Sequence, residues 1–129
     1  MPDTRSEVPV VQRTRLVVLG LFLLGLLVQF YLAGRGVFGA SSFDAHKDLG
    51  DALHPVTLLI LILTLIARTT RNRVDIVLSA LLLVLFEVQF ALADFDHPNA
   101  GAFHPVNALL LLGVGSALFH RDLRVVRGG

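Results

Sequence analysis

The sequence predicts an all-α fold, a four-transmembrane-helix bundle built from a tandem two-helix duplication. Apolar residues make up 54% of the 129 residues, charged residues make up 16%, and the apolar residues gather in four long blocks. The sequence Val-Gln-Phe-Tyr-Leu-Ala at 28–33 recurs as Val-Gln-Phe-Ala-Leu-Ala at 88–93. His-Pro-Val at 54–56 likewise recurs at 104–106. The composition therefore indicates an integral membrane protein, and the recurring segments indicate a tandem duplication.

The four predicted helices follow the apolar blocks 16–33, 53–67, 74–93 and 103–119, each near the ~20 residues that a spanning helix needs. The first block resembles a signal peptide in its basic flank, but no small-residue cleavage site follows it, so we expect a retained helix. The second block is too short to cross alone. Its helix should therefore start near residues 43–48 and kink at Pro55, with the glycine-rich segment 34–39 forming the bend before it.

Alignment of the two copies predicts the domain organisation. The first helix matches the third at an offset of 60, and the His-Pro-Val segments match the second helix to the fourth at an offset of 50. We predict a single membrane domain, with cytoplasmic tails at 1–13 and 121–129, one repeat at 14–72 and a second at 73–120. Two helices in each copy return the chain to the same side, so the repeats should be related by a pseudo-twofold axis along the membrane normal.

The basic residues predict the orientation. Of the eleven Lys and Arg residues, only Arg35 and Lys47 fall in the two loops on the side opposite to the termini. The positive-inside rule therefore places the amino and carboxyl termini in the cytoplasm of a bacterial-type inner (plasma) membrane. The basic residues report topology, not nucleic-acid binding. The lipid bilayer is the expected partner, and a redox partner or a homo-oligomer is left open.

Four polar residues shared by the two copies form the candidate site. Gln29, His54, Gln89 and His104 each lie 14 to 16 residues from the nearest predicted cytoplasmic boundary. At a helical rise of ~1.5 Å per residue, all four lie about 21–24 Å from the inner face, within the outer third of the membrane. Glu87 adds an acid nearby without a counterpart in the first copy. Buried polar side chains in a membrane are costly, which makes this layer the first place to look for function.

Two buried imidazoles on pseudo-symmetric helices are what a six-coordinate b-type haem requires. On this interpretation His54 and His104 are the axial ligands of the haem iron. Gln29 and Gln89 would donate hydrogen bonds to the histidines or the propionates, and Arg35 and Lys47 could neutralise the propionates. The predicted function is electron transfer or haem handling at a site near the outer leaflet.

The layer of histidines gives the chain a resemblance to the four-helix haem membrane proteins, such as cytochrome b561-type electron carriers and one half of a haem A synthase. In those families histidines from alternate helices bind haem near a membrane surface, and the resemblance implies that role for His54 and His104. The segment Gln-Phe-Tyr-Leu-Ala-Gly at 29–34 also resembles a signature of small, uncharacterised bacterial four-helix membrane proteins, which implies no activity.

Two alternatives remain open. His54 and His104 could bond Gln89 and Gln29 across the bundle as interhelical contacts, in a non-enzymatic scaffold or accessory subunit. Alternatively, the loop histidines at positions 46 and 97, which lie beside aspartates, could bind Zn(II) or Cu(II) at the outer face. The sequence contains no nucleophile–base arrangement and no phosphate-binding loop, so it gives no support to a hydrolase or an NTPase.

Overall fold

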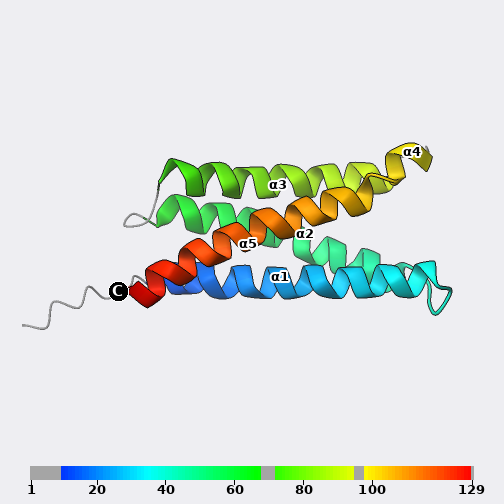
Figure 1. The fold of residues 1–129 in the computed structure, drawn as a ribbon, viewed down its shortest axis with the longest axis horizontal. Coiled ribbons are helices and arrows are strands. Elements are labelled where there is room, and N and C mark those ends of the chain that lie inside the picture. The colour runs from blue at the N-terminus through cyan, green and yellow to red at the C-terminus, as the bar shows by residue number, and fades with distance from the viewer. Residues whose placement is uncertain (1–9, 68–71, 95–97, 129) are drawn as a thin grey trace, which may run out of the picture.

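The structure, a computed structural model, describes residues 10–67, 72–94 and 98–128 (Figure 1). Four long helices dominate it: α1 (Val10–Val37), α2 (Asp44–Ile66), α3 (Arg73–Asp94) and α5 (His104–Gly128). A single helical turn, α4 (Pro98–Gly101), precedes α5. The helix α2 starts at Asp44 and contains Pro55, which confirms the expected early start of this helix.

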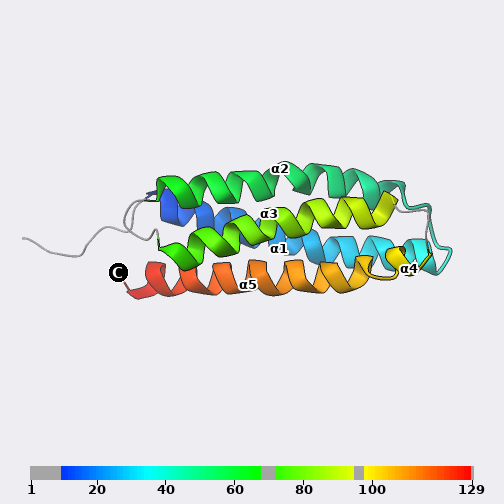
Figure 2. The ribbon, with the colours of Figure 1, turned by 90° about the horizontal axis from the view of Figure 1, so that it is seen from above.

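The four long helices form one bundle in which each helix packs against two neighbours. The packed pairs are α1 with α2, α2 with α3, α3 with α5, and α5 with α1. Successive helices run in opposite directions, so the start of α1 and the end of α5 lie at one end of the bundle (Figures 1 and 2). We call this the terminal end. The opposite end, where α4 and the connection between α1 and α2 lie, is the loop end.

Four helical stretches are long and apolar enough to cross a membrane, by length and composition. They are α1, α2, α3 and the stretch Asn99–Gly128, which includes α5. The predicted all-α fold with four spans is therefore confirmed at this level, and the chain is a multi-pass membrane protein in contact with the lipid bilayer. The division into repeats at 14–72 and 73–120 stays a prediction.

The buried positions of α1 and α3 recur at the offset of 60 that the sequence indicates. Buried residues of α1 at 15, 19, 22 and 26 correspond to buried residues of α3 at 75, 79, 82 and 86. Spacing of three or four residues puts each set on one helical face. The centre of the core includes Phe22 and Phe86, whose ring centroids are 6.0 Å apart.

The helices α2 and α5 correspond at an offset of 58, not at the 50 suggested by the His-Pro-Val segments. Buried positions 53, 57, 60 and 64 of α2 match 111, 115, 118 and 122 of α5. Under this match the counterpart of His104 is His46. His54 lies eight residues further along α2, which is about 12 Å deeper in the bundle. The pattern of buried positions along a helix is therefore a better guide to the structural register than a repeated three-residue motif.

The helices α1 and α5 extend further at the terminal end than predicted. The helix α1 starts at Val10, six residues before the predicted block, and α5 ends at Gly128, nine residues beyond it. These added turns are not solvent-exposed tails, because Gln12 and Asp122 lie on buried faces of the bundle.

The bend between α1 and α2 begins later than the predicted segment 34–39, because Gly34 and Gly36 are still helical. A Cβ atom at Gly36 would lie 2.6 Å from the ring of Phe43, so a larger residue there would require that ring to move. Gly39 supplies the turn itself with a positive φ of 70°.

Candidate functional site

A cavity of about 490 Å³ lies among the four long helices at the loop end. Its size is within the range of small-molecule and cofactor sites. Apolar side chains supply much of the wall: Leu26, Phe30, Phe86, Phe90 and Leu111. The polar groups that line it include both glutamines of the predicted site, two histidines and one lysine: Gln29, Gln89, His46, His104 and Lys47. We call this cavity the loop-end pocket.

His46 of α2 and His104 of α5 meet in the loop-end pocket. Their ring centroids are 6.1 Å apart, and the ring planes are inclined at 63°. Each Nδ1 lies 3.2 Å from a backbone carbonyl oxygen, that of Gln29 for His46 and that of Gln89 for His104. With the Nδ1–H donating to that carbonyl, the Nε2 of each ring remains available to a ligand. The two histidines are thus held in the same way by pseudo-equivalent helices.

The two glutamines differ in their side-chain contacts. Asn107 donates through Nδ2 to Gln89 Oε1 at 2.7 Å and to the Leu85 carbonyl oxygen at 2.8 Å. The position equivalent to Asn107 on α2 is Leu49, which has no side-chain donor. Consequently Gln29 Oε1 is buried without a hydrogen-bond partner among the described residues. An unpaired buried amide oxygen is unusual, and it marks the pocket wall where a ligand could supply the missing contact.

The structure does not bring His54 into the loop-end pocket. His54 Nε2 lies 2.5 Å from Glu87 Oε1 across the α2–α3 boundary. The His54 ring stacks on Phe86 at a centroid distance of 6.0 Å and meets Phe90 edge-on at 5.2 Å. Since both phenylalanines line the pocket, His54 lies behind its aromatic wall. The side chains of His54 and Glu87 are 41% and 56% exposed, so the pair faces outward.

Of the other residues that the sequence singled out, some line the pocket and others lie elsewhere. Arg35 lies in the last turn of α1, is exposed and does not line the pocket, whereas Lys47 does line it. His97 lies outside the described residues. His120, on α5 near the terminal end, contacts the Ser116 carbonyl oxygen of its own helix.

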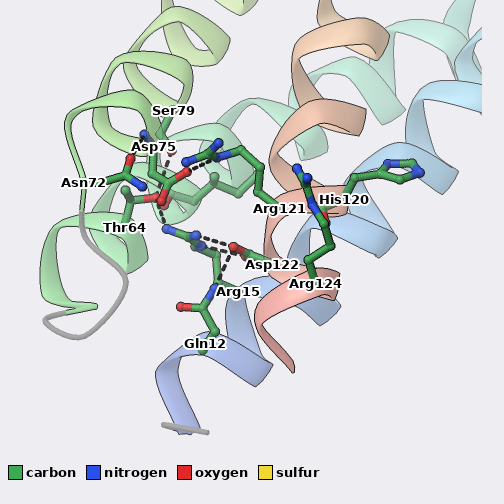
Figure 3. Close-up of polar contacts among 11 residues, drawn as sticks. Gln12, Arg15, Thr64, Asn72, Asp75, Ser79, His120, Arg121, Asp122 and Arg124 are labelled. Atoms are coloured by element: carbon green, nitrogen blue, oxygen red, sulfur yellow. Dashed lines mark hydrogen bonds and ion pairs between the residues drawn. The ribbon is translucent and has the colours of Figure 1, made fainter. Parts of the chain in front are cut away.

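A buried polar network occupies the opposite, terminal end of the bundle (Figure 3). Arg15 of α1 forms a two-pronged ion pair with Asp122 of α5, with its Nε 2.7 Å from Asp122 Oδ2 and its Nη2 bonded to Asp122 Oδ1. Gln12 donates to the same carboxylate at 2.6 Å. Arg15 also donates to Thr64 Oγ1 of α2 at 3.1 Å, and Thr64 contacts Ser79 of α3 at 2.8 Å. This network links all four long helices.

A second ion pair lies next to this network. Arg121 Nε donates to Asp75 Oδ1 at 2.5 Å, and Asp75 is buried while Arg121 is partly exposed. Asn72 accepts a hydrogen bond from the Asp75 backbone N–H at 2.9 Å, which satisfies one of the free donors at the start of α3. Sequence reasoning treated these arginines as boundary charges and did not find either pair. The sequence feature that could have indicated a buried pair is Asp122, an acidic residue among the arginines that follow the fourth apolar block.

Comparison with known proteins relates the chain to one family. Residues 29–96 match the family of unknown function DUF6220, and this match covers just over half of the chain. The chain belongs to the DUF6220 family. The matched segment includes Gln29, His46, His54, Glu87 and Gln89. No curated protein and no solved structure matches the chain. Membership of DUF6220 therefore supplies no activity, and the function has to be argued from the pocket.

Proposed function

We propose that this protein binds one b-type haem in the loop-end pocket and serves in electron transfer or haem handling. His46 and His104 are the axial ligands in this proposal. The observation that carries it is the facing pair of imidazoles, each oriented by a glutamine carbonyl. Histidines that bind metals commonly donate their second ring N–H in this manner, which fixes the ring and its tautomer.

The separation of the two rings supports a shared metal atom. A bond from a metal to a histidine nitrogen is about 2.0 Å, so two rings on opposite sides of one metal have centroids about 6.4 Å apart. The centroids of His46 and His104 are 6.1 Å apart. This separation is compatible with both imidazoles binding one iron.

The donor set also favours haem over a bare metal ion. Among residues 10–67, 72–94 and 98–128, no group of three or more His, Cys, Asp or Glu side chains is placed to hold a metal ion. Protein zinc sites use at least three side-chain ligands. A haem brings four nitrogens of its own, so two histidines complete its coordination.

The other pocket residues suit the edges of such a cofactor. The Lys47 ammonium could pair with a propionate, the role that the sequence suggested for both Lys47 and Arg35. The unpaired Gln29 amide can present its oxygen or, turned over, its NH2 group to the ligand. Phe30, Phe86 and Phe90 keep water from the ring faces, and burial of this kind tunes a haem potential. A bound haem would supply one-electron chemistry, exchanged with a redox partner.

A second candidate is a membrane scaffold or accessory subunit whose polar layer is structural. The hydrogen bonds from Asn107 to Gln89 and to the Leu85 carbonyl favour it, because they join α5 to α3 without any ligand. The scaffold does not account for the Gln29 oxygen or for the Nε2 atoms of His46 and His104, which have no hydrogen-bond partner among the described residues.

Absorption spectroscopy of the purified protein tests the haem proposal. Addition of haem to the detergent-solubilised protein should saturate at one haem per chain, and reduction should give the sharp α-band of a low-spin, bis-imidazole b-type haem. Bound haem should also raise the unfolding temperature, because a ligand that binds only the folded state stabilises it. A haem spectrum that stays that of free haem, with no thermal shift, would favour the scaffold.

We further propose that both termini lie in the cytoplasm of a bacterial-type inner membrane. Arg13, Arg124 and Arg127 are at the terminal end and outside the buried ion pairs, and an excess of basic residues favours the cytoplasmic side. The loop-end pocket then lies in the outer half of the membrane.

Cysteine labelling tests this orientation, because the natural chain contains no cysteine. A cysteine at Ser41 or Asn99 should react with a membrane-impermeant thiol reagent in intact cells, and a cysteine at Asn72 should react only after the cells are opened. The reverse pattern would place the pocket in the cytoplasmic half.

A further inference from the structure

The paired side chains of His54 and Glu87 lie on the lipid-facing side of the bundle, inside the spanning segments. His54 is ten residues from the start of α2, and Glu87 is seven residues from the end of α3. At ~1.5 Å per residue the pair lies about 10–15 Å from the loop end of these helices. Next to it, Leu58 and Val84 are 48% and 56% exposed, as expected of a surface in contact with lipid. An ionisable pair in this setting is costly unless something polar covers it.

The fold itself does not require a polar pair at this place. The internal correspondence of helices gives the bundle two equivalent boundaries, one between α2 and α3 and one between α5 and α1. The position equivalent to Glu87 is Leu27, and the position equivalent to His54 is Leu112. The α5–α1 boundary is therefore apolar at the point where the α2–α3 boundary carries an acid and an imidazole. The pair is a specific feature of one face.

The unused hydrogen-bonding groups of one His54–Glu87 pair are complementary to those of a second, identical pair. The contact uses His54 Nε2 and Glu87 Oε1, while His54 Nδ1 and Glu87 Oε2 have no other partner within the described part of the chain. With His54 protonated, the pair offers one N–H donor and one carboxylate acceptor. Lipid tails can satisfy neither group. A second pair of the same kind can satisfy both.

We infer that the α2–α3 face is the contact surface of a homodimer, with a second copy of this chain as its occupant. His54 and Glu87 lie side by side, so a twofold axis along the membrane normal brings His54 of each copy to Glu87 of the other at the same depth. Such an interface is isologous and closes at two copies. Ala80 and Ala91 lie on α3 seven residues before and four residues after Glu87, and small side chains there allow the helices to approach closely.

Disulfide crosslinking in membranes tests the dimer, again because the natural chain has no cysteine. Val84→Cys, near the centre of the α2–α3 face, should form a disulfide between copies on mild oxidation. The matched control is Leu24→Cys, which lies at the equivalent position of α1 and is similarly exposed at 57%. It should form no disulfide between copies. Equal crosslinking at both positions, or crosslinking of Val84→Cys only to a different protein, overturns the inference.

Energy transfer between fluorescently labelled copies in detergent micelles measures the strength of the interface. Glu87→Leu, which gives this face the residue present at position 27, should raise the dimer dissociation constant about tenfold or more, because two symmetric contacts are lost. Glu87→Gln retains an acceptor and should weaken the dimer less. Leu27→Ala, on the other face, should leave it unchanged. A dimer equally stable in Glu87→Leu, with circular dichroism showing a folded protein, contradicts the inference, as does a monomeric natural chain.

Discussion

Substitution of His46 or His104 by alanine should abolish the low-spin haem spectrum, whereas His54→Ala should preserve it. If the pocket binds haem as proposed, loss of either imidazole should leave a five-coordinate, high-spin iron or no bound haem at all. His54 contacts Glu87 behind the aromatic wall, so its removal leaves both ligands in place. The measurement is the reduced absorption spectrum of each purified variant after haem addition.

His120→Ala is the control for this series, since the His120 side chain contacts the Ser116 carbonyl oxygen of its own helix near the terminal end and does not line the pocket. Its spectrum should equal that of the natural protein. A spectrum lost in His54→Ala and retained in His46→Ala would return the axial role to the residue that the sequence indicated first. A normal spectrum in all three single variants would exclude bis-histidine ligation by any pair of them.

Arg15→Leu should destabilise the bundle by about 3–5 kcal/mol, because it leaves the buried Asp122 carboxylate without its counter-charge. Asp122→Leu should have a similar effect for the reciprocal reason. Arg15 and Asp122 are both fully buried, so water cannot take over the lost contact. The quantity to measure is the unfolding free energy in detergent, from titration with a denaturing detergent.

The double variant Arg15→Leu/Asp122→Leu distinguishes the loss of a charge from the loss of packing. It should recover most of the stability, because apolar replacements of a complete buried ion pair are often neutral or stabilising. Arg13→Leu, which removes an exposed arginine two residues away, should change the stability by less than about 0.5 kcal/mol. If the destabilisation of the double variant instead equals the sum of the two single effects, Arg15 and Asp122 are not energetically coupled.

The number and approximate limits of the spanning helices could be predicted from hydropathy alone, since the membrane demands about 20 apolar residues for each crossing. At the terminal end, α1 and α5 both extend beyond this prediction for the same reason. A charged residue in a sequence marks a helix boundary only if it reaches water. Arg15 and Asp122 instead neutralise one another inside the bundle, and hydropathy does not register a partner 107 residues away.

The candidate site was predicted in part. Gln29, Gln89 and His104 do line one pocket, but the partner of His104 there is His46. The repeated His-Pro-Val segment suggested His54 because local similarity was taken as structural equivalence. The apolar and small residues that face the core, such as Leu53 with Leu111 and Ile60 with Leu118, set the true register. That periodicity was present in the sequence, whereas the carbonyl contacts that orient the imidazoles depend on the distance between helices.

The ion pair between Arg15 and Asp122 also constrains how the protein is made. Helices enter the membrane in the order of synthesis, so Arg15 arrives with the first span and its carboxylate partner arrives only with the last. Until then Thr64 of the second helix is a neutral partner for the guanidinium, and Asp75 of the third lacks Arg121. Completion of α5 satisfies both unpaired charges in one step. A chain that lacked the final helix would therefore leave Arg15 and Asp75 without the ion-pair partners that they have in the complete bundle.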